Sequence, residues 1–127
     1  MNHYVPKGFQ QVIPYFIVED GERFIDFLKK SFEALELERH LDEHGGIMNS
    51  VFRIGDSIIE MGEGNEKYPP RKNTIHIYLA DTDKVYRNAL EAGGISIYEP
   101  EDMSYGERSA GVEDPFGNHW YIATYQG

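Results

Sequence analysis

The chain has 127 residues, of which 40% are hydrophobic and 27% charged, and its formal net charge is −10 at pH 7. This length predicts one domain with one core. The acidic excess argues against binding to a nucleic-acid backbone, and without cysteine the chain has neither disulfides nor thiolate chemistry. Because the sequence shows no signal-like start and no apolar run of membrane-spanning length, we expect a cytoplasmic protein that binds no membrane.

The first half of the chain is expected to contain a strand, a helix and three further strands. An apolar and aromatic run at 12–18 has the composition of a strand, and Pro14 favours a sheet edge or the start of the strand. Asp20 is the expected N-cap of a helix whose phenylalanines and leucine recur at helical spacing up to Phe32. The following strands are expected at 35–39, 48–54 and 57–61, with turns at 45–46 and 55–56.

The second half of the chain repeats this order. A strand at 74–80 precedes a helix whose N-cap is either Thr82 or Asp83. The helix is expected to end at Gly93 and Gly94, because glycine tolerates the positive φ of a helix end. Three strands follow at 95–98, 108–113 and 119–124, separated by a loop at 100–103 and a tight turn at 114–118.

The repeated order indicates an internal duplication, in which matching residues should lie at one fixed offset. The offset from Ile13 to His76 equals that from Asp20 to Asp83, and the offset from Gly55 to Gly117, the glycines before the last strand of each half, is almost the same. Chance similarity within an α+β chain is the alternative interpretation. We therefore predict an α+β protein in which residues 1–127 form a single domain, built from one βαβββ unit at 11–64 and a second at 73–125.

Several short segments resemble the signatures of a known superfamily. Three of them lie at 17–27, at 76–81 and, with the residues Asp-Pro-Phe-Gly-Asn-His-Trp, at 114–120. Together they are similar to the vicinal oxygen chelate superfamily, which contains glyoxalases, bleomycin-resistance proteins and dioxygenases. The resemblance implies two tandem βαβββ units that form a curved, mostly antiparallel sheet around a cavity, and commonly a homodimer. A similarity to the PhnB-like branch lies in the segments 13–15, 54–57 and 105–109.

The resemblance also implies where a metal would bind, because metal-dependent members place one ligand on the first and one on the last strand of each unit. These positions are Ile13, Glu60, His76 and Tyr121. Only Glu60 and His76 are good ligands, since isoleucine has no donor atom and a phenol with a pKa of about 10 is a poor ligand at neutral pH. We expect an incomplete metal site; the alternative is a Zn, Ni, Mn or Fe ion held by Glu60 and His76. This pair is also the candidate catalytic pair, because a desolvated carboxylate beside a histidine can abstract a proton next to a carbonyl.

A further set of side chains is predicted to bind an organic ligand. Arg108 can donate two hydrogen bonds to a carboxylate or phosphate in a bidentate manner. His119 should face the cavity if Tyr121 does, because residues two apart on a strand share a face; a surface position near the turn is the alternative. For the aromatic rings the alternative is ordinary core packing. The set comprises Tyr15, Tyr78, Tyr105, Arg108, His119, Trp120 and Tyr121.

Three functions are compatible with these residues. The first, which we favour, is a glyoxalase- or bleomycin-resistance-like protein that binds a small organic molecule between its two units without a complete metal site. The second is a metal-dependent lyase or isomerase of the glyoxalase I type that uses Glu60 and His76. The third is a catalytically silent protein that acts by association. Dioxygenase chemistry ranks below these, because an iron facial triad needs three ligands and the sequence offers two.

Overall fold

The strands of the protein form two four-stranded sheets. The structure is a computed structural model that describes residues 3–127. Its elements are β1 (Tyr15–Val18), α1 (Gly21–Phe32), β2 (Leu35–Leu41), β3 (Ile47–Ile54), β4 (Ser57–Glu63), β5 (Thr74–Tyr78), α2 (Thr82–Glu91), β6 (Ile95–Met103), β7 (Glu107–Glu113) and β8 (His119–Tyr125). The sheet orders are β1-β4-β3-β2 and β5-β8-β7-β6, so the predicted order β-α-β-β-β occurs twice and the α+β fold is confirmed.

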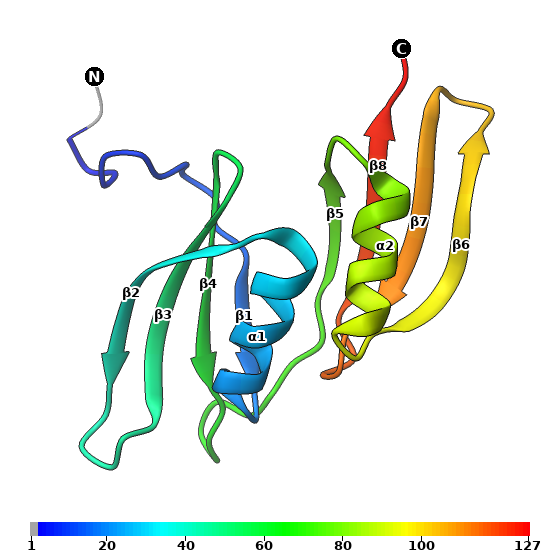
Figure 1. Cartoon of the computed structure of the whole chain (residues 1–127). Helices are drawn as coiled ribbons and strands as arrows, with labels where there is room; N and C mark the ends of the chain where they lie inside the picture. Colours follow the sequence, from blue (N-terminus) through cyan, green and yellow to red (C-terminus); the bar gives the residue numbers. More distant parts are fainter. Residues whose placement is uncertain (1–2) are drawn as a thin grey trace.

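Both sheets are mixed and open. In each, the first strand pairs parallel to the last, and the remaining pairs are antiparallel. The sheets lie side by side with β1 next to β5, and both helices cover the same side (Figure 1). Across the junction, Asn73 donates its side-chain N–H to the Tyr15 carbonyl at 2.9 Å. On the opposite side of both sheets, residues 3–127 form no helix, and the two sheets do not close around a cavity (Figure 1).

The repeat of the element order is confirmed, but its register differs from the predicted one. Tyr15 lies opposite Glu60 in the first sheet, just as His76 lies opposite Tyr121 in the second. Tyr15, not Ile13, therefore occupies the position equivalent to His76. The helix caps show the same register, because Asp20 accepts the N–H of Arg23 and Asp81 accepts that of Lys84. The prediction of Thr82 or Asp83 as the second N-cap is thus wrong, because Asp81 is the N-cap.

The strand β6 also differs from the prediction, since a loop was expected at 100–103. The structure continues the strand to Met103, with register shifts between Ser96 and Tyr98 and between Tyr98 and Glu101. Proline cannot donate a ladder hydrogen bond, and strands accommodate it at edges and bulges. Pro100 lies within the second shift on an edge strand, so the chain stays extended past it.

One core lies between the sheets and the helices and joins the two units. Trp120 of β8 is fully buried and stacks on Phe16 of β1, with ring centroids 5.4 Å apart and planes inclined by 8°. Its ring also lies 4.6 Å from that of Phe32 at the end of α1. Strand alternation places Phe16, Ile59 and Trp120 toward the helices, so their neighbours Tyr15, Glu60 and Tyr121 face the uncovered side. Within residues 3–127, no helix is long and apolar enough to cross a membrane.

Candidate functional site

The uncovered face of the second sheet has a buried carboxylate at its centre. Glu107 begins β7 and is 6% exposed. Its Oε1 accepts the hydroxyl hydrogen of Tyr78 at 3.0 Å, and its Oε2 lies 3.4 Å from Nε2 of His76. Because His76 and Tyr78 are two residues apart on β5, alternation brings both side chains to the same face. We name these three residues the Glu107 cluster.

The cluster combines a protected acceptor with accessible side chains. Tyr78 is 60% exposed and the His76 side chain 45%, whereas Glu107 lies behind them. The Glu107 carboxylate, which accepts the Tyr78 hydroxyl, raises the pKa of that phenol above its ordinary value. A bound molecule would therefore contact a neutral hydroxyl and an imidazole that are held in place by one buried acceptor.

More rings and polar groups extend this face along β6, β7 and β8. The rings of Tyr98 and Tyr121 are stacked, with centroids 6.2 Å apart. The Tyr98 hydroxyl lies 2.5 Å from Oγ of Ser109. The ring of His119 contacts that of Tyr121 edge-on at 6.4 Å, and its Nε2 lies 2.9 Å from Oε1 of Glu113. His119 and Tyr121 thus share a face, while Trp120 between them belongs to the core.

A cleft of about 470 Å³ opens beside the cluster, at the junction of the two sheets. Its walls come from residues 10–14, from the turn between β3 and β4, and from β5. The side-chain amide of Gln10 fixes the first wall, since it donates to the Ile58 carbonyl at 2.6 Å and accepts the Ile58 N–H at 3.1 Å. The lining of this seam cleft is mainly apolar, with His76 and Tyr78 among its polar members; the apolar residues include Val12, Pro14, Ile54, Ile58, Ile75, Ile77 and Leu79.

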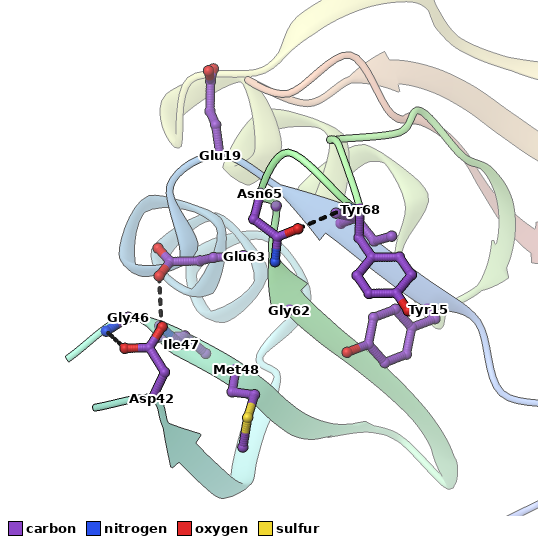
Figure 2. A pocket seen from close by; sticks show the side chains of 12 residues that line it. Tyr15, Glu19, Asp42, Gly46, Ile47, Met48, Gly62, Glu63, Asn65 and Tyr68 are labelled. Atoms are coloured by element: carbon purple, nitrogen blue, oxygen red, sulfur yellow. Dashed lines mark hydrogen bonds between the residues drawn. The ribbon is translucent and has the colours of Figure 1, made fainter. Parts of the chain in front are cut away.

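A second cleft, of about 770 Å³, lies at the end of the first sheet, between β1, the turn that connects β2 to β3, and the loop after β4, and Tyr15 is part of its lining (Figure 2). Glu60, the sequence-predicted catalytic carboxylate, lies directly opposite Tyr15 in the sheet. Its Oε1 accepts the side-chain N–H of Asn49 at 2.9 Å, so the carboxylate meets a hydrogen-bond donor. Glu60 and His76 belong to different sheets, and in the described part of the chain no hydrogen bond or ion pair joins them.

Three other predicted site residues lie away from the Glu107 cluster or at its margin. Arg108 follows Glu107 and points to the other side of the strand, where two guanidinium nitrogens donate to the carboxylate of Asp83. This ion pair raises the pKa of Arg108 and lowers that of Asp83. Trp120 lies beneath the seam cleft but is fully covered. Tyr105 is 69% exposed, and partial desolvation together with the negative charge of Glu107 raises its pKa.

Glu107 itself was missed as a candidate by sequence reasoning. The signal was present, because Glu107, Ser109 and Glu113 alternate with the apolar Ala110 and Val112 along β7 and so share the face away from the helices. Alternation alone does not predict burial, however. The burial of Glu107 depends on β5, which lies well before β7 in the chain and supplies His76 and Tyr78.

Comparisons with known proteins agree with this architecture. Residues 1–122 match the family model described as the Glyoxalase/Bleomycin resistance protein/Dioxygenase superfamily. The chain belongs to this superfamily. Uncharacterised proteins of Mycobacterium bovis and Mycobacterium tuberculosis are each 33% identical to it over 120 residues; both alignments cover 86% of this chain, and they cover 79% and 71% of those proteins respectively.

Solved structures share the fold at lower sequence identity. TioX from a Micromonospora species superposes with a TM-score of 0.78 at 20% identity, over 91% of this chain and 98% of TioX. The fosfomycin resistance protein FosX from Mesorhizobium loti gives a TM-score of 0.66 at 21% identity, over 91% of each chain. At this level of identity the likeness establishes the fold alone.

The superfamily implies a divalent metal in some members, but the side chains at the implied positions do not fit one. With the register seen in the structure, these positions hold Tyr15, Glu60, His76 and Tyr121. Two are phenols, and Glu60 and His76 are separately engaged by Asn49 and Glu107. Among residues 3–127, no group of three or more histidine, aspartate or glutamate side chains is arranged to hold a metal ion. A catalytic metal usually needs about three protein ligands.

Proposed function

We propose that this superfamily member binds a small, flat organic molecule in the seam cleft, with the polar end of the ligand at the Glu107 cluster and without a resident metal. The observation that carries the proposal is the buried Glu107 carboxylate, which contacts His76 and Tyr78, two polar residues in the lining of a mainly apolar cleft. Burying a carboxylate costs free energy unless hydrogen bonds compensate it, and the partners of Glu107 are two side chains that a ligand can reach.

The size and the lining of the seam cleft support this proposal. Small-molecule sites are usually clefts of about 300–1,000 Å³ that are mostly apolar and contain a few polar groups. The seam cleft has a volume of about 470 Å³ and walls of isoleucine and leucine, and His76 and Tyr78 of the Glu107 cluster are among its polar lining residues. The ring pair of Tyr98 and Tyr121 continues the face, which favours a ligand with an aromatic system that stacks.

The names of similar proteins fit a role in small-molecule binding but do not identify the ligand. FosX is named a fosfomycin resistance protein, and this chain shares with it the fold at 21% identity.

In addition, we propose from the sequence resemblance that the chain belongs to the PhnB-like branch, forms a homodimer and acts in the cytoplasm. Sedimentation equilibrium across a range of concentrations tests the homodimer.

The proposal is tested with pairs of bicyclic aromatic compounds that differ only in the methylation of one hydroxyl, such as 2-naphthol and 2-methoxynaphthalene. We expect 2-naphthol to shift the methyl NMR signals of Ile75, Ile77 and Leu79, and to bind several-fold more tightly than the methyl ether, because only the hydroxyl can donate to the cluster. Glu107→Gln should weaken this preference. A matched control is Glu113→Gln, which changes a carboxylate on the same strand outside the cluster. Absence of shifts at these methyl groups across a panel of such compounds would refute the proposed site.

A further inference from the structure

The second cleft differs from the seam cleft in its lining and its charge. It lies between β1, the turn that connects β2 to β3, and the loop after β4 (Figure 2). We propose that this cleft is a separate binding site for an organic ammonium ion that carries an aromatic or alkyl group. The lining residues are Tyr15, Ile17, Glu19, Asp42, Gly46, Ile47, Met48, Gly62, Glu63, Gly64, Asn65 and Tyr68.

The first observation is the exposure of soft, electron-rich side chains around the cleft. Tyr15 is 44% exposed, Tyr68 58% and Met48 60%, although each has a large apolar surface. The faces of tyrosine rings attract organic cations, and pairs of such rings are a common way to bind alkylated amines. The Tyr68 ring already attracts one cation, since Nζ of Lys67 lies 5.4 Å from its centroid. Lys67 is not part of the cleft lining.

The second observation is that the cleft has one sign of charge. Its lining contains the carboxylates of Glu19, Asp42 and Glu63, and among the described residues no lysine, arginine or histidine lines it. Backbone N–H groups fix two of these carboxylates. Glu63 accepts from Gly21 and Ile47, each at 2.7 Å, and Asp42 accepts from His44 and Gly46 at 2.8 and 2.9 Å. These backbone hydrogen bonds lower the pKa of Asp42, because they favour its ionised form.

The third observation is that the absence of a side chain at Gly62 lets the Tyr15 ring lie over the strand at one end of the cleft. A Cβ atom on Gly62 would lie 2.7 Å from the Tyr15 hydroxyl and 2.8 Å from the Met48 carbonyl oxygen. Any larger residue at position 62 would therefore displace Tyr15 or the neighbouring strand. With Gly62 in place, Tyr15 lies over the strand, and Figure 2 shows the tyrosines at one end of the cleft and Asp42 and Glu63 at the other. An ammonium group bound near the rings would thus lie in the field of the carboxylates.

The test uses benzyltrimethylammonium as the cation and neopentylbenzene as its uncharged isostere. The full chain is titrated in buffer of about physiological ionic strength, which screens weak attraction to the net charge of −10. We expect the cation to shift the backbone amide signals of Gly62, Gly64 and Asn65 and the isostere to bind at least about tenfold more weakly, because it lacks the charge. The amides of Ile75 and Ile77 in the seam cleft should not move, so this test is separate from that of the proposed function.

Three variants assign the binding to the cleft. Tyr68→Leu keeps an apolar side chain but removes the ring, and it should raise the dissociation constant about fivefold. Glu19→Gln should raise it about twofold, as expected for one exposed charge. Tyr4→Leu is the matched control, because Tyr4 is 74% exposed and lies outside the lining, and it should leave binding unchanged. Three results would overturn the proposal. They are equal affinity for the isostere, amide shifts scattered over the whole surface, and a dissociation constant that Tyr68→Leu leaves unchanged.

Discussion

Glu107 and Arg108 are neighbours in the chain whose side chains have different roles. Strand alternation sends Glu107 to the uncovered face, where it is buried behind His76 and Tyr78, and sends Arg108 to the other side, where it pairs with Asp83. The Arg108 guanidinium is therefore already paired with a carboxylate of its own chain. The residue that organises the candidate site is Glu107, because it contacts two side chains from a different strand.

Replacing Glu107 should change the ionisation of Tyr78. The carboxylate raises the pKa of the Tyr78 phenol, so Glu107→Gln should lower this pKa toward the ordinary value of about 10. In the wild type, the raised pKa favours folding below the unfolded pKa, and this contribution is lost as the pH rises through the folded pKa. Carbon NMR of the Cζ signal of Tyr78 measures the change. Glu113→Gln is the control and should leave the signal unaffected; an identical titration in both variants would contradict the assigned contact.

The donor set at the superfamily positions predicts weak metal affinity. Because Glu60 and His76 lie on different sheets and the other two positions are tyrosines, we expect no stoichiometric binding when Ni, Zn, Mn or Fe(II) is added to protein that was purified without chelator or affinity tag. Glu60→Ala and His76→Ala should then match the wild type in isothermal titration calorimetry. Binding of one ion per site that both variants lose would contradict this prediction and favour the metal-dependent lyase or isomerase.

At the scale of elements, the turn between β7 and β8 depends on one buried carboxylate. Asp114 is 2% exposed, and it accepts hydrogen bonds from the backbone N–H groups of Phe116 and Asn118, the Asn118 side chain and the indole of Trp120, at 2.8–3.0 Å. This network ties the turn to the strand that carries Tyr121. The corresponding turn between β3 and β4 is tighter and is formed by Gly55 and Asp56. Both residues are exposed.

Loss of the Asp114 carboxylate should destabilise the fold. Asp114→Ala leaves four donors without an acceptor, so we expect the free energy of unfolding to fall by about 3 kcal/mol. Asp114→Asn should cost less, since the amide oxygen still accepts. The comparison is Asp56→Ala in the other turn, with an expected change within about 0.5 kcal/mol. Urea denaturation measures all three, and equal effects of Asp114→Ala and Asp56→Ala would show that the network contributes nothing.

At the scale of the whole molecule, the core contains side chains from both units. Phe16 and Phe32 come from the first unit, and both pack on Trp120 of the second. The free edges of the sheets are β2 and β6, whereas β1 and β5 lie at the junction between them. The arrangement leaves the uncovered faces of both sheets accessible on one side of the molecule.

The shared core predicts a single unfolding transition. Trp120 is the only tryptophan and reports on the core, while circular dichroism reports on both units. The two signals should give the same urea midpoint, and Phe16→Ala should move both midpoints together, at a cost of about 3–5 kcal/mol. Separate midpoints, or a variant that moves the fluorescence midpoint alone, would mean that the units unfold independently.

Local patterns determined most of the elements. Four features follow from interactions within a few residues. They are the N-cap at Asp20, the apolar face of α1 up to Phe32, the positive φ of Gly93 and the short turn at Gly55. The same holds for the opposite orientation of Trp120 and its neighbours, because alternation is a property of any strand. The choice of Asp81 as the second cap was not determined locally, since the Thr82 hydroxyl donates to the Arg108 carbonyl and Asp83 pairs with the Arg108 side chain.

The sequence by itself therefore determined the order of the elements, the duplication and the superfamily, because these depend on short-range patterns that recur along the chain. Only the tertiary structure decided which residues meet. It placed Glu60 and His76 on separate sheets, buried Glu107 behind His76 and Tyr78, and engaged Arg108 with Asp83. The physical reason is that each of these contacts joins strands or helices that are far apart in the chain, and their geometry is set by how two open sheets and two helices pack around one core.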